Sequence, residues 1–156
     1  MSDLLEVVLE NILRSKVCQL LAVLLGHAGQ IIEIQCSEPI DISSETDISE
    51  DEIESFINLN DDASLIIKLN NLNVAGIIIP SVLLRLVKYD DQYDIDFNFD
   101  ESDIAGVGTT GLMKKLHVYI SDLGNNYQVA DWFGGLEPAS DEETRYFTNS
   151  EFGPLG

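Results

Sequence analysis

The sequence predicts an α+β fold, in which an antiparallel or mixed β-sheet packs against helices from the N-terminal part and the C-terminal half of a single domain, residues 1–156. Two segments with the spacing of amphipathic helices lie toward the two ends of the chain, and segments that alternate apolar and polar residues lie between them. Apolar residues make up 45% of the 156, with no internal repeat and no linker. This content is enough for one packed core.

The first segment, from Leu4 to about Leu25, predicts a helix because its apolar residues recur at helical spacing. Asp3 can cap this helix with Glu6 three residues later, and Gly26 can end it. The pattern leaves open whether the segment is one helix or two helices broken near residues 15–16.

The next strand and helix are separated by an acidic loop. Ile31–Cys36 alternates apolar and polar residues, which indicates a strand. Residues 37–51 are polar and acidic and predict a loop. Ser49 and Glu52 have the spacing of a capping box, which predicts a short helix through about Leu59.

Two further strands are expected at Ser64–Leu69 and Val74–Ile79. Residues 70–73, which contain three asparagines, predict the turn between them because Asn tolerates left-handed backbone. Pro80 is expected to end or bend the second strand.

The clearest element is a hairpin of Val82–Tyr89 and Tyr93–Phe99 around residues 90–92. Pairing of Asp90 with Tyr93 gives one core face and one solvated face. In this register Leu84 and Leu86 lie opposite Phe99 and Phe97 on the core face, and Arg85, Val87 and Tyr89 lie opposite Asn98, Asp96 and Asp94 on the other.

A second long helix is expected from a cap at Thr109 or Thr110 to about Leu123, with residues 124–126 stopping it. Its apolar stripe consists of Leu112, Met113, Leu116, Tyr119, Ile120 and Leu123.

Tyr127–Phe133 then predicts a final strand. The tail from Gly134 to Gly156 is rich in Gly, Pro and acidic residues, so it is expected to lie over the surface with at most a strand at Arg145–Thr148.

The charge is extreme, with 28 Asp and Glu against 8 Lys and Arg and a net charge of −20. Direct binding to nucleic acid or to anionic membranes needs Lys and Arg, so the sequence excludes both as partners. Disorder is disfavoured by the high apolar content. The charge therefore indicates a folded protein that attracts a basic partner.

A cytoplasmic location is expected. The N-terminus lacks the positive region of a signal peptide, and the longest apolar stretch, Val17–Leu25, is too short to span a bilayer. Cys18 and Cys36 are expected to be buried free thiols, with a disulfide between them as the alternative.

No catalytic group, metal site or cofactor site is predicted. The run from Asp94 to Asp100 imitates the start of an EF-hand loop, but its sixth residue is Phe99 where the turn needs Gly. The two histidines and two cysteines lack the short spacing of zinc ligands.

Several residues are candidates for binding a partner. The alternation of the hairpin puts Asp94 and Asp96 on one face, which is either simply solvated or a surface for a basic partner. Trp132 and Phe133, beside two glycines, either anchor a partner or end a strand in the core. The predicted partner-binding residues are Asp94, Asp96, Asp131, Trp132, Glu137, Asp141, Glu142 and Glu143.

The hairpin at residues 84–91 and the segment Trp-Phe-Gly-Gly-Leu-Glu-Pro-Ala at residues 132–139 give the chain a resemblance to the immunity proteins of bacterial contact-dependent inhibition and polymorphic toxin systems. The resemblance covers residues 82–155 and is one of general character. It implies a non-catalytic inhibitor that binds one cognate toxin domain, often a basic nuclease, and blocks or distorts its active site. It assigns no role to a particular residue.

The expected function is therefore that of an immunity protein that neutralises a cognate toxin with a basic surface, with a nuclease as the expected toxin. A nuclease presents Lys and Arg to phosphates, so a protein covered with carboxylates is complementary to its cleft. Two alternatives remain open. One is a nucleic-acid mimic that inhibits a DNA-binding enzyme, and the other is a small enzyme that uses Asp94 and Asp96, about 7 Å apart on one strand face.

Overall fold

The computed structural model describes residues 3–38, 40, 42–104, 106–149 and 151–155, so residues 39 and 41 of the expected acidic loop and 150 and 156 of the expected tail lie outside the description. The described strands are β1 (Leu4–Glu10), β2 (Gln30–Cys36), β3 (Ala63–Val74), β4 (Ile77–Tyr89), β5 (Gln92–Asp100), β6 (Asp131–Leu136) and β7 (Arg145–Thr148). The described α-helices are α1 (Arg14–Gly26), α2 (Glu50–Ile57) and α3 (Thr109–Asn126).

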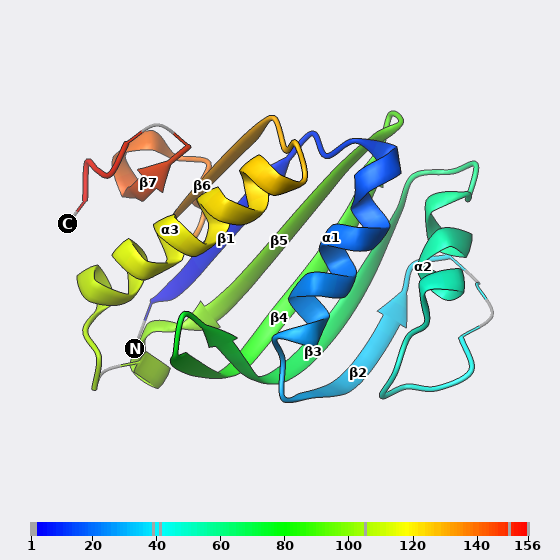
Figure 1. The fold of residues 1–156 in the computed structure, drawn as a ribbon, viewed down its shortest axis with the longest axis horizontal. Coiled ribbons are helices and arrows are strands. Elements are labelled where there is room, and N and C mark those ends of the chain that lie inside the picture. The colour runs from blue at the N-terminus through cyan, green and yellow to red at the C-terminus, as the bar shows by residue number, and fades with distance from the viewer. Residues whose placement is uncertain (1–2, 39, 41, 105, 150, 156) are drawn as a thin grey trace.

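The strands form one sheet in the order β2-β3-β4-β5-β1-β6-β7, and each pair of neighbours is antiparallel. All three helices lie on the same side of this sheet (Figure 1). The core fills the space between the helices and the sheet face that they cover. The predicted α+β class is confirmed. None of the described helices combines the length and the apolar composition that a membrane crossing needs.

The start of the predicted N-terminal helix is wrong, because residues 4–10 form strand β1. Leu5, Val7 and Leu9 are buried on the helix side, and β1 pairs with both β5 and β6 at the centre of the sheet. Apolar residues on both faces of a central strand imitate helical spacing. Asp3 therefore caps no helix, and α1 begins at Arg14 after an N-cap residue without a side-chain cap bond.

The turn predicted at residues 70–73 is also wrong. Strand β3 continues to Val74, and the chain turns at Ala75-Gly76, where φ is 49° and 87°. The left-handed backbone does occur at Asn71, with φ 53°. Asn71 and Pro80 are the two residues that the ladder leaves unpaired between Asn70–Ser81 and Leu72–Ile79. At this point the buried residues change from odd to even numbers along β3. The Asn and Pro signals thus mark an irregularity inside a long hairpin.

The hairpin of β4 and β5 is confirmed, but its register differs by two residues from the prediction. The loop is Asp90-Asp91 alone, with positive φ at both residues, as a tight two-residue hairpin turn requires. Arg85 therefore lies opposite Asp96 and Val87 opposite Asp94. Because a shift of two residues preserves the faces, the predicted core and outer residues remain on their sides.

The remaining elements largely follow the sequence. The capping box of Ser49 and Glu52 and the strand Arg145–Thr148 are confirmed. The stripe of α3 packs into the core as predicted. The helix continues past Gly124 to Asn126, and β6 runs from Asp131 to Leu136 rather than from Tyr127 to Phe133. The first residues of the expected surface tail, 134–136, therefore lie within the sheet, paired with β1. Both cysteines are free, with Cys18 buried and Cys36 only partly so.

Candidate functional site

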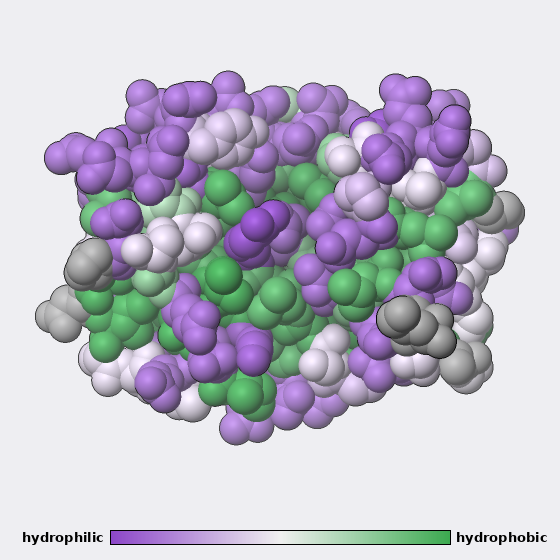
Figure 2. Space-filling model, turned by 180° about the vertical axis from the view of Figure 1, so that it is seen from behind, coloured by the Kyte–Doolittle hydropathy of each residue, from purple (hydrophilic) through white to green (hydrophobic). Residues whose placement is uncertain are grey.

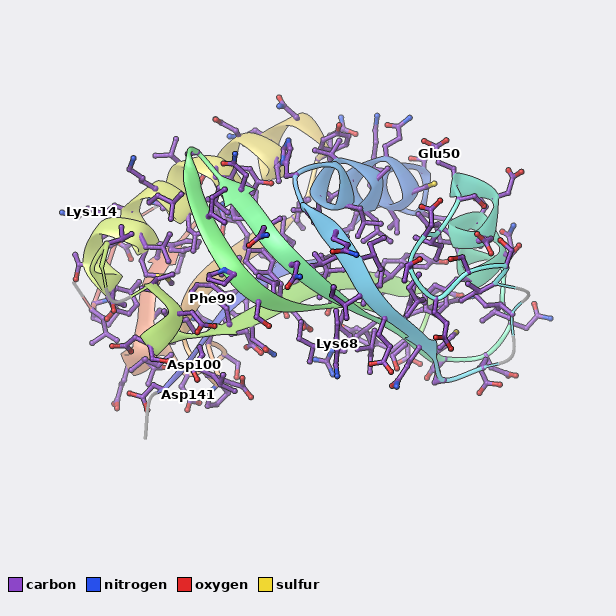
Figure 3. The ribbon with its side chains drawn as sticks, turned by 90° about the horizontal axis from the view of Figure 1, so that it is seen from below. Glu50, Lys68, Phe99, Asp100, Lys114 and Asp141 are labelled. Atoms are coloured by element: carbon purple, nitrogen blue, oxygen red, sulfur yellow. The ribbon has the colours of Figure 1, made fainter. Side chains whose placement is uncertain are left out.

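The side of the sheet opposite the helices is here called the open face. It consists of the outward side chains of β1, β3 as far as Asn70, β4 from Leu83, β5 and β6. Figure 2 shows this side, with apolar side chains gathered over its middle and polar ones around them. Figure 3 shows Lys68 and Asp141 on this side, away from the helices. Within the described residues, none of the three α-helices covers the open face.

Five of the outward carboxylates of β1, β5 and β6 lie close enough together to affect one another electrostatically. This carboxylate cluster consists of Glu6, Glu10, Asp94, Asp96 and Asp131. Strand β1 joins its members, because Val8 pairs with Asp96 on one side and Glu10 pairs with Asp131 on the other. The sequence already placed Asp94 and Asp96 on one face, and the structure adds Asp131 to them through β1. Glu6 and Glu10 were missed because their segment was interpreted as a helix, whereas their even spacing puts both on one face of a strand.

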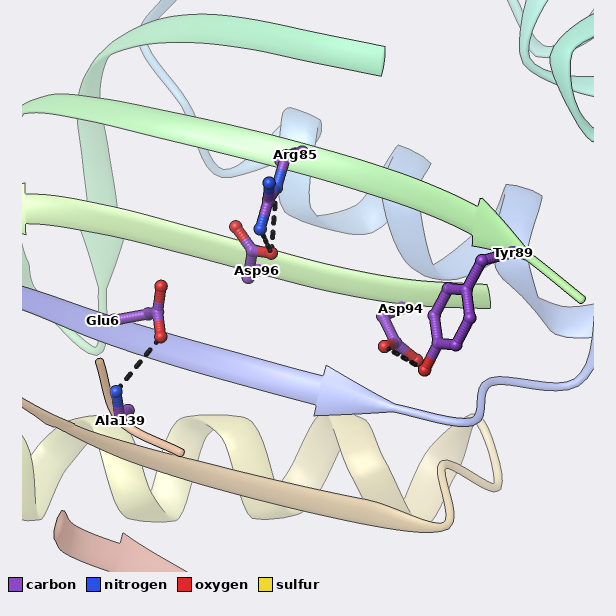
Figure 4. A network of polar contacts seen from close by, with 6 residues as sticks. All are labelled: Glu6, Arg85, Tyr89, Asp94, Asp96 and Ala139. Atoms are coloured by element: carbon purple, nitrogen blue, oxygen red, sulfur yellow. Dashed lines mark hydrogen bonds and ion pairs between the residues drawn. The ribbon is translucent and has the colours of Figure 1, made fainter. Parts of the chain in front are cut away.

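Asp96 is paired with Arg85 across the β4–β5 hairpin. The guanidinium donates to one carboxylate oxygen from Nη2 at 2.8 Å and from Nε at 3.1 Å (Figure 4). Asp96 is only 7% exposed. Burial raises its pKa, and the Arg85 charge and hydrogen bonds offset part of that effect.

Asp94 is also held by groups of the chain itself. Its Oδ2 accepts a hydrogen bond from the Tyr89 hydroxyl at 2.9 Å (Figure 4). Its Oδ1 accepts one from the Asn11 backbone N–H at 2.9 Å. The bond to Asp94 raises the pKa of Tyr89 to about 12. The expectation that Asp94 and Asp96 face water freely is therefore wrong, because Asp94 is only 9% exposed and both are hydrogen-bonded.

Glu6 and Glu10 add negative charge beside these two residues. Glu6 Oε1 accepts a hydrogen bond from the Ala139 N–H at 3.2 Å (Figure 4). Burial raises the pKa of Glu6, and the charge of Asp96 adds to this. Burial likewise raises the pKa of Glu10, with further contributions from Asp94 and Asp131. The environment of Glu6, Glu10 and Asp96 therefore disfavours the charged forms of these three carboxylates.

Glu10→Gln is expected to raise the melting temperature at pH 7.5. The folded state raises the pKa of Glu10 above 4.5, so ionisation of this group costs stability, and the loss develops as pH rises from about 4.5 through the higher folded pKa. Thermal melts at pH 7.5 and pH 4 measure this, and the gain should shrink at pH 4, where Glu10 is mostly protonated in the unfolded state and more so in the folded state. A variant that melts lower than the parent at pH 7.5 contradicts the prediction.

The acidic tail borders the carboxylate cluster. Glu137, Asp141, Glu142 and Glu143 are all exposed. The tail is tied to the open face through the Ala139–Glu6 bond and through Arg145, whose Nε donates to the Ala139 carbonyl at 2.9 Å. Glu137 lies near enough to Glu6 to raise its pKa. Glu142 and Glu143 line a separate hollow toward the C-terminus with Arg145 and Glu151.

Trp132 faces the helices, not the open face. It is 5% exposed, its indole N–H donates to Ser121 Oγ at 3.1 Å, and its ring lies directly over Gly124 of α3. The sequence left open whether Trp132 anchors a partner or lies in the core, and the structure places it in the core. Phe133 points to the open face, where the Arg145 guanidinium lies 4.3 Å from its ring centre.

Among the described residues, no group of three or more His, Cys, Asp or Glu side chains is placed to hold a metal ion. Asp94 and Asp96 are engaged by Tyr89, Asn11 and Arg85. The open face presents acidic and apolar side chains side by side, a surface complementary to a protein partner with basic and apolar side chains.

Comparison with known proteins identifies the family. Residues 3–152 match the family model described as PABL017 Cdi1I immunity protein. The chain belongs to this immunity protein family. The resemblance to immunity proteins of contact-dependent inhibition systems is thereby confirmed, and it extends over nearly the whole chain rather than residues 82–155 alone.

A solved structure supports the same assignment. The chain is similar to a chain in the crystal structure of the toxic C-terminal tip of CdiA from Pseudomonas aeruginosa in complex with immune protein. The two share 32% sequence identity, each is covered over 100% of its length, and the TM-score is 0.91. A search of curated proteins found no match.

Proposed function

We propose that this member of the family is a non-catalytic inhibitor that binds and neutralises one cognate toxin domain, the C-terminal tip of a CdiA-type protein. The observation that carries the proposal is the full-length similarity to a chain of a complex between a CdiA toxic tip and its immune protein, at 32% identity. Membership of an immunity protein family supports the same role.

We further propose that the toxin is basic and acts on nucleic acid. The net charge of −20 favours a cationic partner. A nuclease must carry Lys and Arg to hold phosphates, so its cleft is complementary to a surface of carboxylates. The immunity protein itself contacts neither nucleic acid nor membrane, and it acts in the cytoplasm, where its two cysteines stay reduced.

The test uses the toxin domain encoded by the gene beside that of this chain. Expression of that domain alone should arrest growth, and coexpression of the chain should restore it. The purified pair should form a complex in size-exclusion chromatography. Failure of both protection and complex formation contradicts the proposal.

The two alternatives give different results in the same system. If the chain is a carboxylate-dependent enzyme, dialysis against a chelator should lower its melting temperature or abolish protection, and one divalent ion should restore them. If it is a nucleic-acid mimic, it should inhibit a DNA-binding enzyme of the cell without any toxin present. The proposed function predicts neither effect.

A further inference from the structure

The open face has an apolar half beside the carboxylate cluster. Ile66 of β3 and Leu83 and Val87 of β4 point outward and are partly exposed, and they surround Arg85. Val8 of β1 continues this surface toward β6. In Figure 2 these strands carry the apolar side chains over the middle of the face. A sheet face that combines exposed apolar side chains with a polar rim is typical of a protein interface.

The acidic half of the open face carries more carboxylates than its neighbouring arginines neutralise. The positive charge of Arg85 stabilises the charged forms of Asp96 and Glu6, and that of Arg145 stabilises the charged form of Glu10. The five carboxylates of the cluster therefore have two arginines beside them. Neighbouring like charges oppose folding of the free protein. Residues that oppose folding in this way are expected where a partner supplies the missing opposite charge.

The two halves meet around one row of the sheet. Along it, Ile66, Arg85, Asp96, Val8 and Phe133 lie side by side on successive strands. Beyond the end of this row a hollow of about 160 Å³ opens between Glu10, Asp131, Phe133 and Arg145. Since a water occupies about 30 Å³, this hollow has room for the charged end of a Lys or Arg side chain.

We propose that the open face is the surface that seats the toxin domain, with basic side chains of the toxin against the carboxylate cluster and apolar side chains against Ile66, Leu83 and Val87. This inference rests on the proposed function and adds the place and the chemistry of the contact. Charge complementarity selects the occupant, because a second copy of this chain would bring another cluster of carboxylates against the first.

The decisive experiment compares two variants with the same change in net charge. The face variant is Glu10→Lys with Asp131→Lys, and the control is Glu54→Lys with Asp122→Lys, two exposed positions on α2 and α3 on the other side of the sheet. The face variant should raise the Kd for the toxin by about 100-fold or more, because like charges would then meet in the contact. The control should change Kd by only about fivefold, through weaker long-range attraction.

A second pair of variants tests the apolar half. Leu83→Lys should weaken binding about tenfold or more, because it places a charge in the middle of the contact. Val118→Lys is the matched control, since Val118 is 64% exposed on α3 and should leave Kd nearly unchanged. If Glu10→Lys with Asp131→Lys fails to fold by circular dichroism, Glu10→Gln with Asp131→Asn replaces that variant and should still weaken binding about tenfold.

The possible outcomes distinguish failure of the proposed binding surface from failure of the proposed function. If the parent chain binds and protects while the face and control variants weaken binding equally, the toxin binds elsewhere and the inference is wrong. If the free protein is a dimer that Leu83→Lys dissociates, the face belongs to a second copy, which also overturns the inference. If the parent chain neither binds nor protects, the proposed function fails before the surface is in question.

Discussion

Trp132→Ala is expected to lower the free energy of unfolding by about 3–5 kcal/mol, the range for removal of a large buried aromatic side chain. The indole is 5% exposed, packs on Gly124 and donates a hydrogen bond to Ser121, so the substitution opens a cavity between α3 and β6 and removes that bond. Urea denaturation followed by circular dichroism measures the loss. A variant that unfolds like the parent but loses toxin binding would instead make Trp132 a binding anchor.

The contact between Trp132 and Gly124 provides an internal control. A Cβ atom at residue 124 would lie 2.3 Å from the indole ring, so Gly124→Ala should destabilise the parent by about 1–3 kcal/mol through overpacking. In the Trp132→Ala background the ring is absent, and alanine is the better helix former by about 1 kcal/mol. Gly124→Ala should therefore stabilise that background. Equal effects in both backgrounds would contradict the packing shown by the structure.

The fold class and the core faces could be predicted from the sequence because side-chain alternation has a period of two. For β4 and β5, the predicted register is off by two residues, yet Leu84 and Phe97 still face the core and Arg85 and Asp96 still face outward. The register itself depends on positive φ at Asp90 and Asp91, and the composition of the loop did not distinguish a two-residue turn from a longer one.

The candidate site was harder to predict because its members meet only through β1. The spacing of apolar residues from Leu4 to Leu9 fits a helix as well as a central strand, and only the pairing with β5 and β6 decides between them. Because this strand was assigned as a helix, Glu6 and Glu10 were not predicted as members of the site. The burial of Asp94 could not be predicted either, because it depends on contacts with Tyr89 and with the backbone of Asn11, which is distant in sequence.

Association with the toxin is expected to be fast at low salt and to slow by about 10–100-fold between 0.01 M and 0.15 M salt. The net charge of −20 produces a long-range field, and the Debye length shortens from about 30 Å to about 8 Å over this range. The dissociation rate should change much less, because it depends on contacts already formed. Stopped-flow mixing across a salt series measures both rates, and an association rate independent of salt would rule out steering.

The Glu54→Lys with Asp122→Lys variant shows which charges carry the steering. Each reversal weakens the field without changing the open face, so the salt dependence of the association rate should become shallower while the dissociation rate stays that of the parent. Glu10→Lys with Asp131→Lys removes the same amount of charge but should also speed dissociation, because these two residues lie in the proposed contact. The association rate thus depends on the charge of the whole chain, and the dissociation rate depends on the contacts of the open face. The proposal that the toxin is basic and the proposal that it binds the open face can therefore fail independently.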